Sequence, residues 1–135
     1  MTDGLETYEH HEQGYMPLVY GNSWMVALLN HEPIMDVEKA VEIERHNLTD
    51  EVFILLKGMA AFYLVREDQP LELVELKPGC IYNVIKGTWH NLLATKDASF
   101  AIVENRDTDK VDTEIRPLSL QEKQQILRKL PGWVK

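Results

Sequence analysis

The chain has 135 residues, of which 44% are hydrophobic and 27% are charged, and its formal net charge is −8. This length favours one domain over residues 1–135, and the acidic balance disfavours nucleic acid and anionic membranes as partners. No apolar run is long enough for a transmembrane helix, and the N-terminus lacks the apolar segment of a signal peptide. The single cysteine, Cys80, excludes an internal disulfide, so we expect a cytoplasmic protein in which Cys80 is buried.

Short apolar segments separated by turn residues predict an all-β fold. After an irregular stretch of about twenty residues, strands are expected at residues 24–29, 41–46, 52–56, 59–65, 71–76, 81–84, 90–94 and 100–104. The run 52–56 is continuously apolar, which is typical of a strand buried on both faces. About eight strands at this spacing favour a sandwich or barrel, with its core over residues 24–105.

The end of the chain has the periodicity of a helix. Ser119 and Glu122 have the spacing of a capping box, and Pro131-Gly132 ends the segment, which predicts a helix over residues 119–130. Apolar side chains recur at helical spacing at Leu120, Ile126, Leu127 and Leu130. This stripe favours packing against the domain, with a contact between two copies of the chain as the second interpretation.

Glu44 and His46 are the first candidates for a functional site. Side chains two residues apart on a strand share a face, so both project the same way from the strand at 41–46. Taken alone, the pair fits better on a solvated strand face, with Val41 and Ile43 on the inner side.

Glu51 and His90 lie in more apolar surroundings. Glu51 begins an apolar run, and a carboxylate that points into an apolar interior is costly unless it is paired or bound to a metal. The alternative places Glu51 in water at the end of its strand. A lone histidine such as His90, with apolar face-mates, is more often a core or rim residue than a ligand. Only Glu44, His46, Glu51 and His90 together favour a metal site.

Other polar residues on the expected strands have no fixed direction. Tyr63, Tyr82, Asn83 and Glu104 are of this kind. A slip of one residue in strand register moves each side chain to the opposite face, so each is at least as well placed facing outward as facing inward. Trp89 is expected to point away from its neighbour His90 and to pack in the core.

Two segments resemble the two sequence motifs of the cupin superfamily. The second half of the first motif, G-x5-H-x-H-x3–4-E-x6-G, is matched by His46, Glu51 and Gly58. The frame of the second motif, G-x5-P-x-G-x2-H-x3-N, is matched by Gly79, Gly87 and His90. The chain departs from the motifs at four positions, which carry Glu38, Glu44, Ile85 and Ala94 in place of glycine, histidine, proline and asparagine.

The change at Glu44 affects the metal site that the resemblance implies. A glutamate still binds metal, which gives a set of two histidines and two carboxylates formed by Glu44, His46, Glu51 and His90. In the alternative, Glu44 is free to act as a general base and the other three residues form the ligand set. Such oxygen and imidazole donors suit Fe(II), Mn(II), Ni(II) or Zn(II).

The resemblance implies a double-stranded β-helix, which is a jelly-roll barrel of two antiparallel sheets with room for one small-molecule ligand. It also implies a homodimer, in which the strand at 24–29 is the candidate for a crossing between subunits, with packing on its own barrel as the equal alternative. The activity it favours is that of an isomerase, epimerase, lyase or dioxygenase on a small oxygen-rich metabolite, with Glu44 catalytic. The alternative is a non-catalytic cupin that binds a small metabolite or holds a structural metal.

Overall fold

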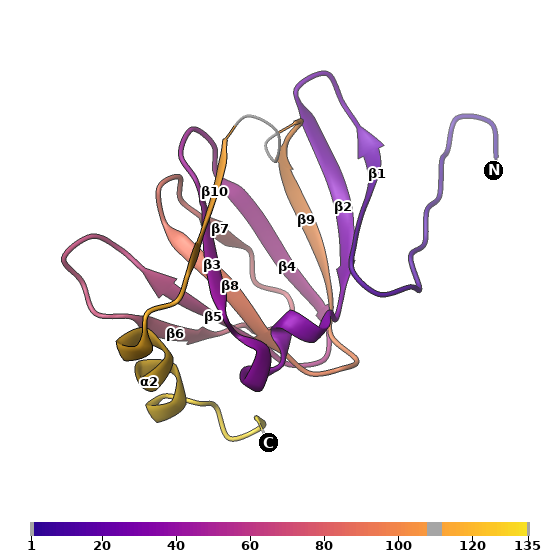
Figure 1. The fold of residues 1–135 in the computed structure, drawn as a ribbon. Coiled ribbons are helices and arrows are strands. Elements are labelled where there is room, and N and C mark those ends of the chain that lie inside the picture. Colours follow the sequence, from indigo (N-terminus) through magenta and orange to yellow (C-terminus); the bar gives the residue numbers. More distant parts are fainter. Residues whose placement is uncertain (1, 108–111, 135) are drawn as a thin grey trace.

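The computed structural model describes residues 2–107 and 112–134, which form two facing β-sheets and a C-terminal helix (Figure 1). The strands are β1 Tyr15–Tyr20, β2 Trp24–Asn30, β3 Glu42–His46, β4 Glu51–Lys57, β5 Ala60–Val65, β6 Glu72–Glu75, β7 Tyr82–Val84, β8 Trp89–Ala94, β9 Ser99–Asn105 and β10 Thr113–Pro117. The helices are the 3-10 turns η1 Pro33–Met35 and η2 Val37–Lys39 and the α-helix α2 Leu120–Arg128. No helix in the described ranges is long and apolar enough to cross a membrane.

Each sheet has five strands, in the orders β1-β2-β9-β4-β7 and β10-β3-β8-β5-β6. Neighbouring strands are antiparallel, and most neighbours in each sheet are distant in sequence. Figure 1 shows α2 against the second sheet, at the side away from the first. The predicted all-β fold, a double-stranded jelly roll with a C-terminal α-helix, is therefore confirmed.

The described residues form two apolar cores, one on each side of the second sheet. The larger core lies between the sheets and includes Phe53, Phe62 and Phe100. The smaller core lies where α2 covers the second sheet, and it contains Ile43 and Ile126, both at most 2% exposed. The outer face of β3 therefore packs under α2, and its inner face, toward the space between the sheets, carries the functional side chains.

The expected placement of Val41 and Ile43 inside is wrong for Val41 and correct for Ile43, and the solvated face expected for the pair Glu44 and His46 is wrong for His46, which is buried. Val41 is 49% exposed, whereas Ile43 is fully buried in the core beneath α2. Glu44 and His46 are on the opposite face of β3, toward the space between the sheets. The alternation along the strand was predicted correctly. The face that carries Ile43 is buried beneath α2, in the smaller core, and not between the sheets.

Two strands are absent from the prediction, β1 and β10. Both are edge strands, and each contains a proline, Pro17 or Pro117. Proline lacks the N–H of a sheet ladder and is confined to edges and bulges, and the pairing of β1 with β2 shifts register between Pro17 and Val19. Proline is unusual inside a strand, so the prolines that are tolerated at these edges also kept both segments from being predicted as strands.

The expectations for residues 52–56 and for Cys80 are also wrong. Phe53 and Leu55 are buried between the sheets, but Leu56 is 52% exposed and the remaining side chains are half-buried. The reason is that α2 covers the other sheet, so the outer face of β4 keeps contact with solvent. Cys80 is exposed rather than buried.

The capping box predicted for α2 is present. The Ser119 hydroxyl accepts from the Glu122 N–H at 3.0 Å, and the Ser119 N–H donates to the Glu122 carboxylate at 2.9 Å. Arg116 donates to both oxygens of the same carboxylate, at 2.8 and 2.9 Å. The apolar stripe is only partly used, because Ile126 is buried while Leu120 and Leu127 are at least 60% exposed.

Replacing Glu122 by alanine is expected to destabilise the fold by about 1 kcal/mol at pH 7, because a cap and a paired carboxylate are lost together. The hydrogen bonds from Arg116 hold the pKa of Glu122 down to about 2, against an ordinary value of 4.5. Since the folded pKa is lowered, this contribution is present above pH 4.5 and disappears as the pH falls toward 2. Urea unfolding should therefore show a larger effect at pH 7 than at pH 3.

Gln121→Ala, at an exposed position in the first turn of the same helix, is the matched control and should change stability little at either pH. An equal loss for Glu122→Ala at pH 7 and pH 3 would contradict the proposed role of the ionised carboxylate.

Candidate metal centre

Strand register brings the four predicted site residues to one place. Glu44 on β3 is the cross-strand partner of His90 on β8, and His46 follows two residues later on the same face of β3. From the opposite sheet, Glu51 at the start of β4 is the partner of Glu104 on β9. Two histidines and one glutamate from one sheet therefore face two glutamates from the other.

The contacts within this cluster are short. The Nε2 atoms of His46 and His90 lie 3.0 and 3.3 Å from Oε1 of Glu51, and Glu44 Oε1 lies 4.0 Å from His90 Nε2. One ligand atom from each of the four residues lies within 4.8 Å of the others. His46, Glu51 and His90 are buried, so the alternative with Glu51 in water at the strand end is wrong, while the Glu44 side chain is 36% exposed.

Hydrogen bonds to the Nδ1 atoms fix the orientation of both histidine rings, so that Nε2 of each ring faces the cluster. The Thr88 carbonyl lies 3.0 Å from His90 Nδ1 and can only accept, so Nδ1 carries a proton. His46 Nδ1 lies 3.0 Å from the Thr113 hydroxyl. Partners of this kind behind a histidine are typical of metal ligands, because they orient the ring and its free nitrogen.

This arrangement provides a test of whether the residues fit a metal ion. With Nδ1 protonated, a neutral His90 turns the lone pair of Nε2 toward the Glu51 carboxylate, so two hydrogen-bond acceptors face each other at 3.3 Å. Such a contact is stable only when a cation lies between the two atoms. The cation is either a proton bound to the imidazole or a metal ion. The donor set of Glu44, His46, Glu51 and His90 could hold a divalent ion.

Glu51 and Glu104 form a hydrogen-bonded pair of carboxyl groups with opposite pKa shifts. Burial acts to raise the pKa of Glu51, but the hydrogen bonds from His46 and His90 outweigh it and hold that pKa far below its usual range. Burial, together with the contact to Glu51, raises the pKa of Glu104 to about 9. Glu104 is therefore protonated at neutral pH, and the Tyr15 hydroxyl lies 3.3 Å from its Oε1.

Burial also raises the pKa of Glu44, and the negative charge of Glu51 adds to this effect, against the pull of His90. Glu44 therefore combines partial exposure with a carboxylate that is easier to protonate than one in water. Both properties are those of a group that exchanges protons with an occupant of the cavity.

Sequence analysis left the direction of Glu104 open and missed the participation of Tyr15 and Thr113. Glu104 alternates with the buried Phe100 and Ile102 along β9, and this pattern is the signal that could have placed it on the inner face. Tyr15 and Thr113 lie on the two edge strands that were not predicted. The contact of Thr113 with His46 depends on the pairing of β10 with β3, which no local pattern reveals.

The other three residues whose facing direction the sequence left undecided lie outside the metal cluster. Tyr63 is buried in the core beneath α2, Tyr82 packs against the core between the sheets, and Asn83 donates to Asp50 on the outside. Trp89 points away from His90 as expected, but it is half-buried, with the guanidinium groups of Arg45 and Arg116 at 4.5 and 4.8 Å from its ring.

The cluster lies in the wall of a cavity of about 390 Å³ between the sheets. Polar lining residues outside the four include Tyr15, Glu32, Glu42, Asn91 and Glu104, while the apolar lining includes Leu29, Met35, Phe53 and Ile102. A volume of this size accommodates a small metabolite rather than a peptide or a nucleic acid strand.

Solved structures with the same architecture identify the fold. A cupin-2 domain protein from Shewanella frigidimarina is 26% identical, with a TM-score of 0.52, over 71% of this chain and 85% of that one. KdgF from Halomonas is 18% identical, with a TM-score of 0.53, over 82% and 97% of the two chains. The chain has the cupin fold.

Pac13, described as a nucleoside dehydratase, shares the same arrangement at 16% identity, with a TM-score of 0.55, over 84% of this chain and 88% of its own. No protein-family model and no curated protein matches the chain. The cupin fold is therefore seen through three-dimensional structure, and the two sequence segments that resemble cupin motifs carry the candidate metal centre.

Proposed function

We propose that this cupin is a metal-dependent enzyme that acts on a small oxygen-rich metabolite bound between its sheets. The observation that carries the proposal is the convergence of two imidazole Nε2 atoms and two carboxylates in the wall of a cavity of about 390 Å³. A purely structural ion needs no adjoining cavity and is usually enclosed by its ligands. Here the ligand set adjoins a space that a substrate can enter.

Within this proposal, His46, Glu51 and His90 hold the ion, which would be Fe, Mn, Ni or Zn. A bound divalent ion supplies a Lewis acid that polarises an oxygen of the substrate. Glu44 is the catalytic base, because it is the most exposed of the four and lies 4.0 Å from His90, farther than the contacts made by Glu51. Its carboxylate would remove a proton from substrate carbon or oxygen and return it, as isomerases, epimerases and lyases require.

Solved structures with the same fold support the proposal that the fold serves catalysis here. Pac13 is described as a dehydratase, and a variant of it from Streptomyces is described with uridine. These likenesses concern the fold, so the substrate of the present protein follows from its own cavity.

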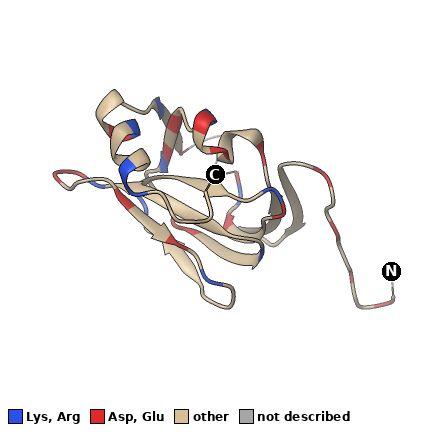
Figure 2. Cartoon of the chain, turned by 90° about the horizontal axis from the view of Figure 1, so that it is seen from below, with Lys and Arg blue, Asp and Glu red and all other residues tan. Residues whose placement is uncertain are grey.

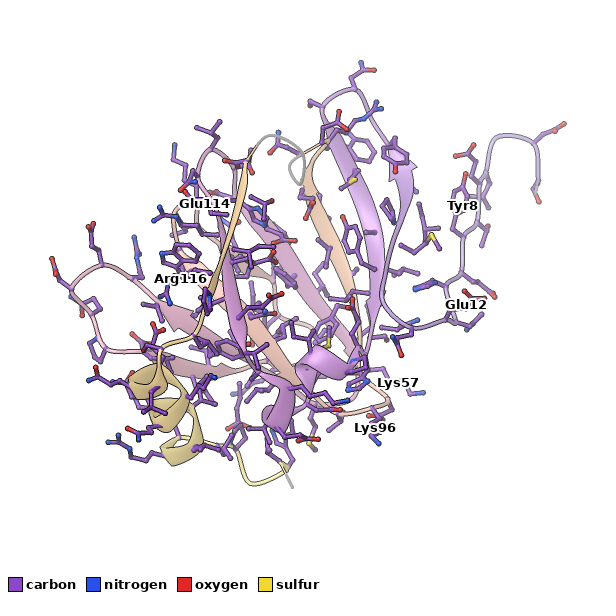
Figure 3. The ribbon with its side chains drawn as sticks, viewed as in Figure 1. Tyr8, Glu12, Lys57, Lys96, Glu114 and Arg116 are labelled. Atoms are coloured by element: carbon purple, nitrogen blue, oxygen red, sulfur yellow. The ribbon has the colours of Figure 1, made fainter. Side chains whose placement is uncertain are left out.

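We also propose that the protein is a cytoplasmic homodimer. The support for a dimer is the edge strand β1, which pairs only with β2 among the described residues and carries the exposed side chains of Met16 and Tyr20. Residues 6–12 precede it as an arm, in which Tyr8 is seen away from the sheets in Figure 3, while the backbone oxygens of His10 and Glu12 accept hydrogen bonds from Asn30 of β2. Light scattering of the purified chain should give a mass near 31 kDa, about twice the 15.6 kDa of one chain.

The catalytic proposal is tested by proton exchange. The protein, loaded in turn with each of the four metals, is incubated in D2O with a set of small polyols, hydroxyketones and hydroxyamines, and deuterium at carbon is followed by NMR. We expect exchange on at least one compound, its loss on chelation, and a reduction of at least about 100-fold in Glu44→Gln, since general base catalysis contributes about 10²–10⁴-fold.

The control for this experiment is Glu114→Gln, which removes a carboxylate on the outer face of β10, where Glu114 pairs with Arg45 at 3.1 Å. This variant should exchange like the wild type. If metal is bound but no compound exchanges with any of the four ions, the non-catalytic alternative, a binding protein or a structural metal site, replaces the enzyme.

A further inference from the structure

The cavity carries more negative charge than the candidate metal centre explains. Five glutamates line it, and among the residues that the structure describes no lysine or arginine does. Two of the five, Glu32 and Glu42, are half-buried and belong to no ligand set. Five carboxylates outnumber the two positive charges of one divalent ion, and no basic side chain of the described residues lines the cavity to offset the rest.

Several basic side chains close in sequence to the cavity residues, or on strands paired with theirs, face other surroundings. Arg45 and Arg116 lie over the ring of Trp89, on the face of the sheet away from His90. Lys57 ends the strand that Glu51 begins, and it shares a separate surface hollow with Lys96, as seen at the lower end of Figure 3. Basic and acidic residues are interspersed on the sheets and on the C-terminal helix, whereas the N-terminal arm carries acidic side chains only (Figure 2).

This charge selects the kind of molecule that can enter. A carboxylate or phosphate entering the cavity would lose its water and meet carboxylates of the same sign, in a space where screening is weak. Hydroxyl and ammonium groups instead offer N–H or O–H donors to the carboxylate oxygens of the wall, which can only accept when ionised. Like-charge contacts of this kind are a strong means of excluding the wrong ligand.

We infer that the site takes a small neutral or positively charged ligand rich in hydroxyl or ammonium donors, and that it rejects carboxylates and phosphates. The inference rests on the same cavity as the proposed function and narrows its substrate to polyols and amino-polyols. It removes the decarboxylation of small acid anions from the reactions that the metal centre would otherwise serve.

Three six-carbon probes that differ only at one terminal group test this inference. Glucamine carries an ammonium group, glucitol a hydroxyl group and gluconate a carboxylate. Their binding is followed by NMR of the ¹⁵N-labelled protein, metal-free and Zn(II)-loaded. The reporter is the side-chain amide of Asn91, which lines the cavity, and the internal control is that of Asn30, which donates to the backbone oxygens of His10 and Glu12.

We expect glucamine to bind most tightly, glucitol next, and gluconate at least about tenfold more weakly than glucitol. Glu42→Gln should narrow the difference between glucitol and gluconate, because it removes one charge from the wall and leaves the backbone contacts of β3 in place. Glu72→Gln removes the same charge from the exposed strand β6 and should leave the difference unchanged.

Gluconate binding equal to or tighter than that of glucitol, or the absence of any shift at Asn91 with all three probes, would overturn the inference. The metal content of the same samples reports on the proposed function separately. The order of affinities is expected with and without Zn(II). A protein that binds no metal but still binds the probes in this order would contradict the metal-dependent enzyme and leave the charge inference standing.

Discussion

Replacing His90 or Glu51 by alanine is expected to abolish stoichiometric metal binding. His90 Nε2 and Glu51 Oε1 lie 3.3 Å apart, and Glu51 also contacts His46, so each variant removes a donor from the middle of the cluster. Loss of a residue that merely orients a ligand costs about 10–100-fold in metal affinity, and loss of the ligand itself should exceed 100-fold. Metal bound to tag-free protein is measured by plasma mass spectrometry after dialysis against each metal.

Two comparisons make this experiment specific. His11→Ala removes a histidine whose side chain is 82% exposed and lies outside the cluster, and should keep the metal content of the wild type. Thr113→Val removes the hydroxyl behind His46 and should weaken binding by about 10–100-fold without abolishing it. Glu51→Gln, which preserves the shape of the side chain, guards against a folding defect in Glu51→Ala.

Glu44→Ala separates the two roles left open for Glu44. Retained metal in this variant agrees with Glu44 as the base, whereas lost metal makes it the fourth ligand. Wild-type metal content in both His90→Ala and Glu51→Ala would contradict the metal centre itself.

Replacing Gly58 by alanine is expected to destabilise the fold by about 3 kcal/mol. Gly58 joins β4 to β5 with a φ of +79°, and a left-handed conformation costs a residue with a side chain about 1–2 kcal/mol. An added Cβ would also lie 2.6 Å from the Cα atom of Ala98, where only backbone movement can relieve the overlap. Overlap of this kind adds about 1–3 kcal/mol. Urea unfolding at pH 7 measures the sum.

Gly87→Ala is the matched control, because Gly87 has nearly the same φ of +82° but no atom within 4 Å of an added Cβ. It should cost only the conformational part, about 1–2 kcal/mol. Both glycines occupy positions of the cupin-like motifs, so equal losses in the two variants would contradict the close approach of Ala98 as the cause of the larger effect.

The local periodicity of the chain was sufficient to predict most of the fold. Short apolar segments between turn residues identified eight strands near their observed positions, and the Ser119–Glu122 spacing identified the helix. Edge strands β1 and β10 escaped because each contains a proline and has one free side, so neither needs a strong apolar alternation.

The chemistry of the site was readable from the sequence for a similar reason. Glu44, His46, Glu51 and His90 stand at positions of the two cupin-like motifs, and the alternation of a strand explains why Glu44 and His46 share a face. Bringing them next to Glu51 and His90 depends on the register and packing of the two sheets. Their use as metal ligands stays a prediction until the variants above are measured.

The sequence by itself determined the class of fold, the C-terminal helix and the four residues that converge. Only the tertiary structure decided that Glu104 joins Glu51, that Thr113 lies behind His46, and that α2 covers the outer face of β3. The physical reason is that these contacts depend on register between strands far apart in the chain, where a shift of one residue reverses every side chain. The sign of the charge in the cavity depends on the same register, because carboxylates from both sheets must face one space.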